Sequence, residues 1–411
     1  MKEEKIYMLE EICTGKGTYG IGASAVAYDS SKYTYLRITD INDDGTLNKG
    51  DLKSVDDEEA YKYILQKNDI VFARTGNSTG RSYFYDGTDG ELVYAGFLIK
   101  FSLDPSKVNP RIMKYYTHSQ DYYDWVKSFD TGGTRGNINA KTYGLMPITL
   151  PPREVQDKIV EVLKSIDEKI ELNKRINDNL EQQAQALYKS WFVDFEPFKN
   201  GDFVESELGL IPEGWKIGKI NDVINLLSGF PFKSSDFQEN GYYKLITIKG
   251  VQDGYLDVTS ADRLSSLPSK MPQYCILNIG DILISLTGNV GRICIVDRNN
   301  LLLNQRVAIL SPKNARDSFY AYTMFRSESM KNELIHLARG TAQLNLSPIE
   351  TSEKLIAIPP DSILEAFAKV GKETFNQYIS LKMENIRLTE MRDTLLPKLM
   401  SGELKINDLD C

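Results

Sequence analysis

Histidine, cysteine and long apolar runs are scarce in this sequence of 411 residues. It contains two histidines and four cysteines, and no two cysteines form a C-x-x-C pair. Because structural zinc sites use closely spaced Cys and His ligands, we expect no metal site. No stretch reaches the roughly 18 to 20 uninterrupted apolar residues of a membrane helix, and the charged start MKEEKIYMLEE does not match a signal peptide. These absences predict a reducing, cytoplasmic location and no membrane partner.

Sequence motifs for catalysis are also absent. Neither the G-x-x-x-x-G-K-[ST] phosphate loop nor the G-x-S-x-G nucleophile turn occurs, so we predict no catalytic residue. The hydrophobic content of 41% and charged content of 26% are ordinary for soluble globular domains, of which this length accommodates two to four. The formal net charge of -8 does not by itself favour nucleic acid, although a local basic face is compatible with it.

One glycine motif requires an explanation. In CTGKGTYGIGAS, residues Gly15, Gly17 and Gly20 have the G-x-G-x-x-G spacing of dinucleotide sites, and Asp40 follows about where a ribose-binding carboxylate would lie. Such a site requires a long helix after the glycines, and ASAVAYDSSKY leaves room for barely two turns. We therefore interpret the loop as a flexible turn. A stand-alone nucleotide-dependent enzyme is the alternative hypothesis.

Two long segments rich in helix formers each follow a Pro-Pro pair. The first, REVQDKIVEVLKSIDEKIELNKRINDNLEQQAQALYKSWF, has neither Gly nor Pro. A seven-residue repeat along it, with Val162 and Ile176 each three residues after a member, predicts a heptad seam and a partner helix. The seam residues are Ile159, Ile166, Asn173, Leu180 and Leu187. The polar Asn173 either fixes the register or marks a solvated kink.

The second segment follows Pro359 and Pro360, is weakened by Gly371 and is predicted to stop at Pro397. A shift of 208 residues superposes the two Pro-Pro pairs and both helices. The repeat continues upstream, where NDIVFARTGNSTGRS parallels GDILISLTGNVGRIC, and DTGGTRGNI parallels LARGTAQLNL.

The repeat predicts an α+β protein in which two globular domains are separated by two long antiparallel coiled-coil helices, with internal pseudo-twofold symmetry. The predicted parts are a first domain at 1–150, a first helix at 151–196, a linker at 197–214, a second domain at 215–358, and a second helix with a tail at 359–411.

The segments LPPREVQDKIVEVLKSIDEKIELNKRINDNLEQQAQALYKSWFVDFEPF, ELGLIPEGWKIGKIND and RDTLLPKLMSGELKI give the chain its recognisable character. It resembles the specificity (S) subunit of type I restriction-modification systems, the HsdS family, over essentially its whole length. The resemblance implies two target recognition domains, each reading one half of an asymmetric bipartite DNA target. It implies that the helices set the spacer.

The same resemblance implies partners and cofactors. Two methyltransferase subunits would dock on the helices for adenine-N6 methylation, and restriction subunits would add ATP-dependent cleavage. S-adenosylmethionine, ATP and Mg are expected on those partners, with no cofactor bound by this chain. An [N/D]-P-P-[Y/F] methyltransferase motif is absent, since the Pro-Pro pairs read LPPR and IPPD. A coiled-coil scaffold without DNA function is a further alternative.

Candidate DNA contacts lie in the duplicated loops, because base edges are read by Arg, Asn, Gln and Thr side chains at loop tips. In the first domain they are Arg74, Thr75, Asn77, Arg81, Arg135 and Asn137, and in the second Thr287, Asn289, Arg292, Arg339, Thr341, Gln343 and Asn345. Weaker candidates for phosphate or base contacts are Lys16, Tyr19, Arg37, Lys233, Lys249 and Arg306. Ordinary turn chemistry is the alternative role for these loops.

Candidate docking residues for the methyltransferase subunits, by the resemblance, lie near the helix ends. They are Trp191, Phe192, Phe195, Leu395, Leu396 and Leu399. Aromatic side chains at a helix end also serve to pack that end on a domain of the same chain, which is the alternative.

Overall fold

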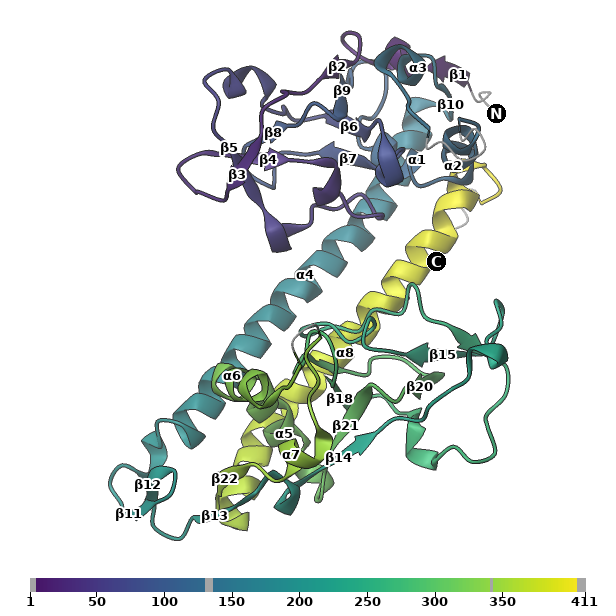
Figure 1. Ribbon diagram of the computed structural model, residues 1–411. Helices are drawn as coiled ribbons and strands as arrows, with labels where there is room; N and C mark the ends of the chain where they lie inside the picture. The colour runs from purple at the N-terminus through teal and green to yellow at the C-terminus, as the bar shows by residue number, and fades with distance from the viewer. Residues whose placement is uncertain (1–4, 130–135, 341–342, 405–411) are drawn as a thin grey trace. The chain divides into compact units, whose positions relative to one another are not determined.

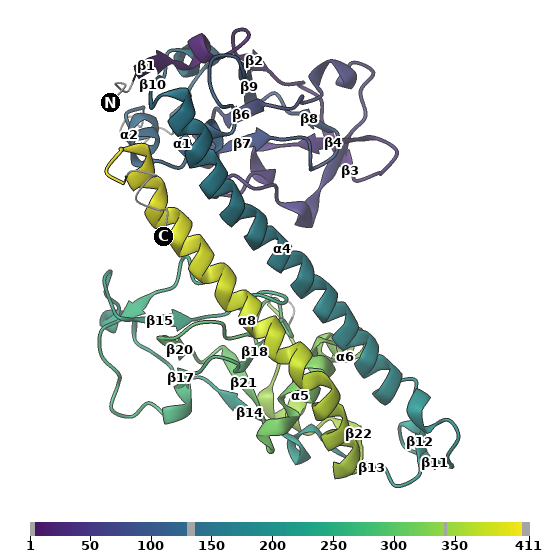
Figure 2. The same cartoon turned by 180° about the vertical axis from the view of Figure 1, so that it is seen from behind.

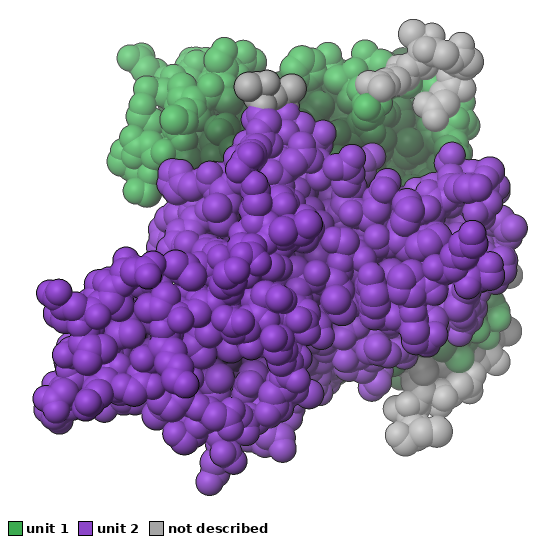
Figure 3. Space-filling model, turned by 60° about the horizontal axis from the view of Figure 1, so that its bottom comes forward, with its two compact units in different colours: residues 1–169, 388–411 green, residues 170–387 purple. Residues whose placement is uncertain are grey.

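The computed structural model describes residues 5–129, 136–340 and 343–404 (Figure 1). The chain forms two compact units, coloured separately in Figure 3: unit 1 comprises residues 1–169 and 388–411, and unit 2 comprises residues 170–387. The long helices α4 (Arg153–Phe192) and α8 (Asp361–Met400) each contribute one end to each unit.

Unit 1 contains two four-stranded sheets. Their strand orders are β2-β9-β6-β7 and β3-β5-β4-β8, and β1 pairs with β10. The strands are β1 (Lys5–Met8), β2 (Thr18–Tyr19), β3 (Ala25–Ala27), β4 (Tyr33–Leu36), β5 (Lys53–Val55), β6 (Asp69–Ala73), β7 (Ser82–Tyr85), β8 (Leu92–Tyr94), β9 (Leu98–Ser102) and β10 (Pro147–Leu150). The short helices are α1 (Ile112–Tyr116), α2 (Gln120–Lys127) and α3 (Ala140–Gly144).

Unit 2 repeats this plan. Its sheets have the orders β14-β21-β18-β19 and β16-β15-β20-β17, and β13 pairs with β22. The strands are β13 (Lys216–Lys219), β14 (Ile224–Ser228), β15 (Tyr243–Ile246), β16 (Arg263–Leu264), β17 (Ile276–Leu277), β18 (Ile282–Ser285), β19 (Ile293–Ile295), β20 (Leu301–Leu303), β21 (Val307–Pro312) and β22 (Leu355–Ile358). The helices are α5 (Ser318–Arg326), α6 (Glu328–Leu337) and α7 (Pro348–Ser352). The predicted α+β class and internal repeat are confirmed.

The repeat extends to the direction in which individual strands pair. In unit 1 β4 runs parallel to β8, and in unit 2 β15 runs parallel to β20, while all other pairs in these four sheets are antiparallel. The strands β6 and β18 are buried along their whole length, which explains their continuous apolar runs.

The long helices pack antiparallel within unit 2, where the end of α4 lies beside the start of α8 in both views (Figure 2). Asn173 of α4 is fully buried and donates hydrogen bonds to Glu384 at 2.8 Å and Asn385 at 2.9 Å. The ring centroid of Trp191, further along α4, lies 5.5 Å from that of Phe367, which is earlier in α8. From Asn173 to Trp191 the chain runs forward along α4, while the partners from Asn385 to Phe367 run backward along α8, so the helices are antiparallel. The burial of Asn173 rules out a solvated kink at that position.

In unit 1 the same helices are tied by an ionic cluster. Asp167 of α4 accepts hydrogen bonds from Lys114 at 2.6 Å and from Arg392 of α8 at 3.1 Å. Burial acts to raise the pKa of Asp167, but the two cations outweigh it and hold that pKa below its ordinary value.

The buried line of α4 differs in part from the predicted seam. Ile159 and Ile166 are buried, and Leu180 and Leu187 are partly buried against the core of unit 2. The helix also buries the side chain four residues after each of the first four seam residues: Leu163, Ile170, Asn177 and Ala184. The predicted positions three residues after a seam residue, Val162 and Ile176, are only half-buried. The reason is that α4 packs on the globular domains as well as on α8, and both contacts share one face.

Two predicted helix ends need correction, and the predicted linker has a structure of its own. The helix α4 ends at Phe192, and the expected linker contains a hairpin of β11 (Phe203–Ser206) and β12 (Gly209–Pro212). The helix α8 continues through Pro397 to Met400. Pro397 lies in the last turn, where its missing N–H removes only one helical hydrogen bond. Gly371 lies so close to Phe319 that a Cβ atom would overlap the Phe319 ring, so this glycine permits close packing.

The glycine-rich loop is also structural, because β2 lies within it, between Gly17 and Gly20, and β3 follows it instead of a helix. A Cβ atom on Gly20 would overlap the carbonyl oxygen of Tyr94, and one on Gly17 would overlap the Phe101 ring. In unit 2, Gly229 meets the carbonyl oxygen of Asn304 in the same way. The interpretation as a flexible turn is therefore wrong at Gly17 and Gly20. They are glycine because another part of the chain passes at very short range.

Candidate nucleic-acid interface

Each unit gathers its duplicated loops at the end of its first sheet. We call this the tip surface: Tyr19, 74–81, Phe97 and 136–139 in unit 1, and Ser228, 286–292, Arg306 and 343–347 in unit 2. Within the repeat, backbone hydrogen bonds are conserved at these places. The Ile138 N–H donates to the Arg74 carbonyl at 3.0 Å, and the Leu346 N–H donates to the Leu286 carbonyl at 2.7 Å.

The repeated T-G-N sequence has a shared backbone shape. Gly76 and Gly288 both have φ of +75°, which explains why each copy needs a glycine there. The following residues, Asn77 and Asn289, are exposed. The fold thus brings the separate loops of each unit into one surface with polar side chains at its turn.

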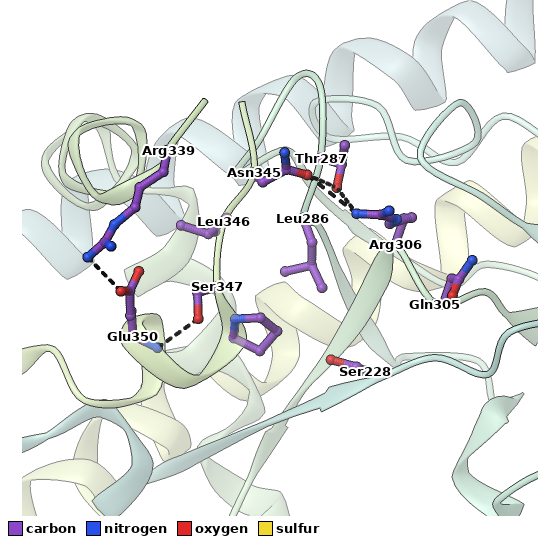
Figure 4. A pocket seen from close by; sticks show the side chains of 11 residues that line it. Ser228, Leu286, Thr287, Gln305, Arg306, Arg339, Asn345, Leu346, Ser347 and Glu350 are labelled. Carbon is purple, nitrogen blue, oxygen red and sulfur yellow. Dashed lines mark hydrogen bonds and ion pairs between the residues drawn. The ribbon is translucent and has the colours of Figure 1, made fainter. Parts of the chain in front are cut away.

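In unit 2 the tip surface borders a cavity of about 500 Å³. Four predicted residues, Thr287, Arg306, Arg339 and Asn345, line it (Figure 4). The Thr287 hydroxyl donates to the side-chain oxygen of Asn345 at 2.9 Å, and Arg306 Nη1 lies 3.4 Å from the same oxygen. Arg306 and Asn345 are exposed whereas Thr287 is buried, so the arginine and the amide are the accessible members of this polar group.

The opposite wall of the cavity carries an ion pair. Arg339 lies 2.7 Å from Glu350, and its side chain is 82% exposed. Because exposed ion pairs contribute only about 0–1 kcal/mol, Arg339 can exchange this carboxylate for another acceptor at little cost.

In unit 1 the tip surface is organised around Arg74. Its guanidinium carbon lies 5.0 Å from the centroid of the Tyr19 ring and 6.0 Å from that of Phe97. The Tyr19 hydroxyl accepts a hydrogen bond from the Ala140 N–H at 3.1 Å, which fixes this ring. Thr75 beside Arg74 is half-buried.

Several predicted arginines are committed to internal partners. Arg37 donates to Asp40 at 2.6 and 2.9 Å, and this hydrogen bonding raises the pKa of Arg37 despite its partial burial. Arg81 pairs with Asp43 at 2.6 Å, and Arg292 bonds to Gln252. These side chains hold loops together, as the turn-chemistry alternative predicts.

The remaining predicted contacts are exposed side chains, of which Asn137 and Gln343 belong to the tip surface and the three lysines do not. They are Lys16, Asn137, Lys233, Lys249 and Gln343. Arg135 and Thr341 lie outside the described residues. Phe97, which is 56% exposed, is a tip-surface residue that sequence reasoning missed. It occupies the position of Arg306, and aligning YAGFL with LNQRV between the two halves would have placed it.

The predicted docking residues are largely internal. Leu396 and Leu399 are 5% and 2% exposed in the core of unit 1, and Leu395 packs against that core. In unit 2, Phe192 packs on Tyr320 with ring centroids 4.9 Å apart, and Phe195 packs on Trp215 at 5.2 Å. Trp191 is half-buried in the same aromatic group. The docking role is therefore not retained for Leu396 and Leu399, and the aromatic residues pack the helix end on a domain of their own chain.

Over the described ranges, no helix is long and apolar enough to cross a membrane. Within those same ranges, no three His, Cys, Asp or Glu side chains are grouped as metal ligands.

A family model described as the type I restriction modification DNA specificity domain matches residues 1–182 and 212–385, one segment for each half of the repeat. The chain belongs to this specificity family. It is similar to the type I restriction enzyme MjaIX specificity subunit of Methanocaldococcus jannaschii, with 29% identity over 301 residues, covering 72% of this chain and 69% of that protein. It is also similar to the HindI specificity subunit of Haemophilus influenzae, with 25% identity over 407 residues, covering 84% of this chain and 88% of that protein.

The fold has a counterpart among solved structures. The S subunit of a type I restriction-modification system from M. genitalium matches with a TM-score of 0.55 and 17% identity, over 97% of this chain and 96% of that one. The family membership comes from the family model, and this similarity shows that the fold is shared.

Proposed function

We propose that each unit of this specificity subunit reads one half of an asymmetric, bipartite double-stranded DNA target through its tip surface. One observation carries the proposal: the two tip surfaces share backbone hydrogen bonds and differ in side chains. Arg74 in unit 1 corresponds to Leu286 in unit 2, since each donates its N–H to the equivalent carbonyl, of Phe97 or Arg306. Surfaces with the same frame and different donors should read different sequences.

The long helices are proposed to set the spacer between the half-sites. The antiparallel pairing within unit 2 with the buried hydrogen bonds of Asn173, and the contact of Asp167 with Arg392 within unit 1, support a fixed helix register. The buried Leu396 and Leu399 do not provide a docking surface, so two methyltransferase subunits would contact the exposed faces of the helices instead.

The chemistry is proposed to lie on the partners. The methyltransferase subunits would bind S-adenosylmethionine and methylate adenine N6, and restriction subunits would supply ATP- and Mg-dependent cleavage. This chain would act without catalysis, by choosing the DNA sequence. The family membership and the absence of a nucleotide motif from the sequence support this division.

The test is a domain exchange. Residues 1–150 are replaced by the matching domain of a relative, and the chimera is expressed with the cognate methyltransferase in a host that lacks DNA methylation. Methylome sequencing should show one half of the target changed and the other half kept. Exchange of 215–358 is the matched control and should change the other half.

A chimera that methylates an unchanged target, or that changes both halves, would contradict the proposal. Methylation without sequence preference would favour the scaffold alternative.

A further inference from the structure

One arginine on the tip surface of unit 1 differs in its surroundings from the other candidate arginines. Arg74 lies against the rings of Tyr19 and Phe97, at 5.0 and 6.0 Å from their centroids. Both rings are accessible, with Tyr19 41% and Phe97 56% exposed. A cation held by aromatic faces keeps its full charge while its orientation is restricted.

The guanidinium of Arg74 is also uncommitted. Within the part of the chain that the structure describes, it has neither a carboxylate nor a hydrogen-bond acceptor, and its Nε–H is buried without a partner. By contrast, Arg37, Arg81 and Arg339 each pair with a carboxylate. A buried donor without an acceptor is unfavourable, so this arrangement is retained at a cost to stability. Its two terminal nitrogens remain available to an external ligand.

We propose that Arg74 reads a guanine in the half-site bound by unit 1. This inference rests on the proposed function. The planar guanidinium donates two parallel hydrogen bonds, which match the O6 and N7 acceptors of guanine in the major groove. Tyr19 and Phe97 act as positioning residues, because they hold the guanidinium plane without using its terminal N–H groups.

Unit 2 reads its half-site differently at the same place. Leu286 replaces Arg74, and Arg306 replaces the aromatic Phe97. The arginine of unit 2 therefore comes from the neighbouring loop, and its Nη1 lies 3.4 Å from Asn345 and 3.5 Å from Thr287. The two tip surfaces accordingly present an arginine from different positions and with different neighbours.

The experiment compares Arg74→Leu and Arg74→Lys with the parent chain, each expressed with the cognate methyltransferase in the methylation-free host. Both variants should lose roughly 10- to 100-fold of the discrimination at one G·C pair, in the half-site assigned to unit 1 by the domain exchange. Lysine should not restore it, because an ammonium group lacks the planar pair of donors. The other half-site should be unchanged.

A matched control removes the same charge elsewhere. Lys67→Leu removes an exposed cation just before β6, at the end of that strand away from Arg74 and outside both the tip surface and the long helices. It should leave the methylated sequence unchanged.

Phe97→Leu should weaken the discrimination at the same G·C pair as Arg74→Lys, and Phe97→Tyr should retain that discrimination. A purely structural role of Phe97 would not produce such a base-specific effect.

Two results would overturn the guanine assignment. Uniformly weaker methylation with an unchanged sequence would show a phosphate contact, and an unchanged methylome would show no contact. Arg74→Lys keeps the charge and the contact with the rings, so its result does not depend on the tolerance of the fold for Leu. If the domain exchange succeeds while these variants have no effect, this inference fails and the proposed function stands.

Discussion

In unit 1 an arginine emerges from the end of β6 between two aromatic rings, and in unit 2 the equivalent backbone position carries Leu286, with the arginine displaced to the loop before β21. The hydrogen bonds that join the loops are the same in both units. The comparison shows that this fold separates the groups that build the tip surface from the groups displayed on it, so one can vary without the other.

Away from the tip surface, a second pair of equivalent positions also combines a shared backbone with different side chains. Gly45 and Gly254 both have positive φ, and each lies against the side chain at one equivalent position, His118 in unit 1 and Arg326 in unit 2. Arg326 bonds to Glu181 at 3.1 Å, whereas Nδ1 of the His118 ring lies 2.9 Å from the Lys114 carbonyl. The same turn therefore packs against an ion-paired arginine in unit 2 and against a histidine in unit 1.

The largest effect is expected where the cores of the two units differ. Gly371 of α8 corresponds to Leu163 of α4, and a side chain at 371 would overlap Phe319. Gly371→Leu should destabilise unit 2 by about 3 kcal/mol or more. Gly371→Ala should also destabilise it, since the overlap outweighs the gain of about 1 kcal/mol in helix propensity. Calorimetric unfolding of the full chain, with hydrogen exchange in α5, measures this loss.

The matched control for this prediction is the pair Gly371→Ala with Phe319→Ala. Removing the ring should make the alanine at 371 neutral or favourable relative to Phe319→Ala alone. Single variants at 371 as stable as the parent chain would refute the overlap.

A smaller effect should be equal in the two units. Gly20→Ala and Gly229→Ala each place a Cβ atom on a carbonyl oxygen of the neighbouring chain segment, of Tyr94 and of Asn304. Each should cost about 1–3 kcal/mol, because backbone atoms on both sides must shift. Denaturant unfolding of the variants tests this, and Gly15→Ala, with nothing within 4 Å, should stay within about 0.5 kcal/mol of the parent. A loss of stability in only one of the two variants would show that Gly20 and Gly229 are not structurally equivalent.

The smallest effect should be a pH dependence confined to unit 1. Burial lowers the pKa of His118, and Lys114 and Arg392 lower it further, against the Lys114 carbonyl and Asp44, which raise it. The unfolded chain therefore takes up a proton at a higher pH than the folded chain, so unit 1 should lose stability as pH falls below about 6.5. The slope for one such group is at most about 1.4 kcal/mol per pH unit.

Hydrogen exchange in α1 at pH 7.5 and 5.5 measures this dependence. His118→Gln should abolish this part of it. His118→Arg installs the residue of unit 2 beside two cations, so it should destabilise unit 1 at both pH values. Equal pH dependence in His118→Gln and the parent chain would show that the histidine is not responsible.

The repeat and the long helices could be predicted from the sequence because spacing and side-chain type are local properties. The T-G-N turns were predictable for the same reason, and Thr287 and Asn345 do meet at the tip surface. The partner of a side chain is not a local property. Arg81 and Arg292 have the composition of DNA contacts, and only the fold reveals that Asp43 and Gln252 already occupy them.

The docking prediction does not hold for Leu396 and Leu399 for a related reason, since both are buried in the core of unit 1. Their composition fits a docking surface and a domain core equally well, and Leu399 is covered by residues hundreds of positions away in the chain. Phe97 was missed because an exposed phenylalanine is a poor DNA candidate by itself. Its role depends on Arg74, which follows β6, whereas Phe97 lies in the connection before β9.

The placement of Leu396 and Leu399 has a consequence for synthesis on the ribosome. These residues share the core of unit 1 with Leu9 and Ile12, near the opposite end of the chain. The apolar interior of the first domain therefore stays open until translation is almost complete, whereas unit 2 is closed by segments made close to it in time. Contacts between such distant residues form slowly, so this part of the core of unit 1 should be completed late in folding.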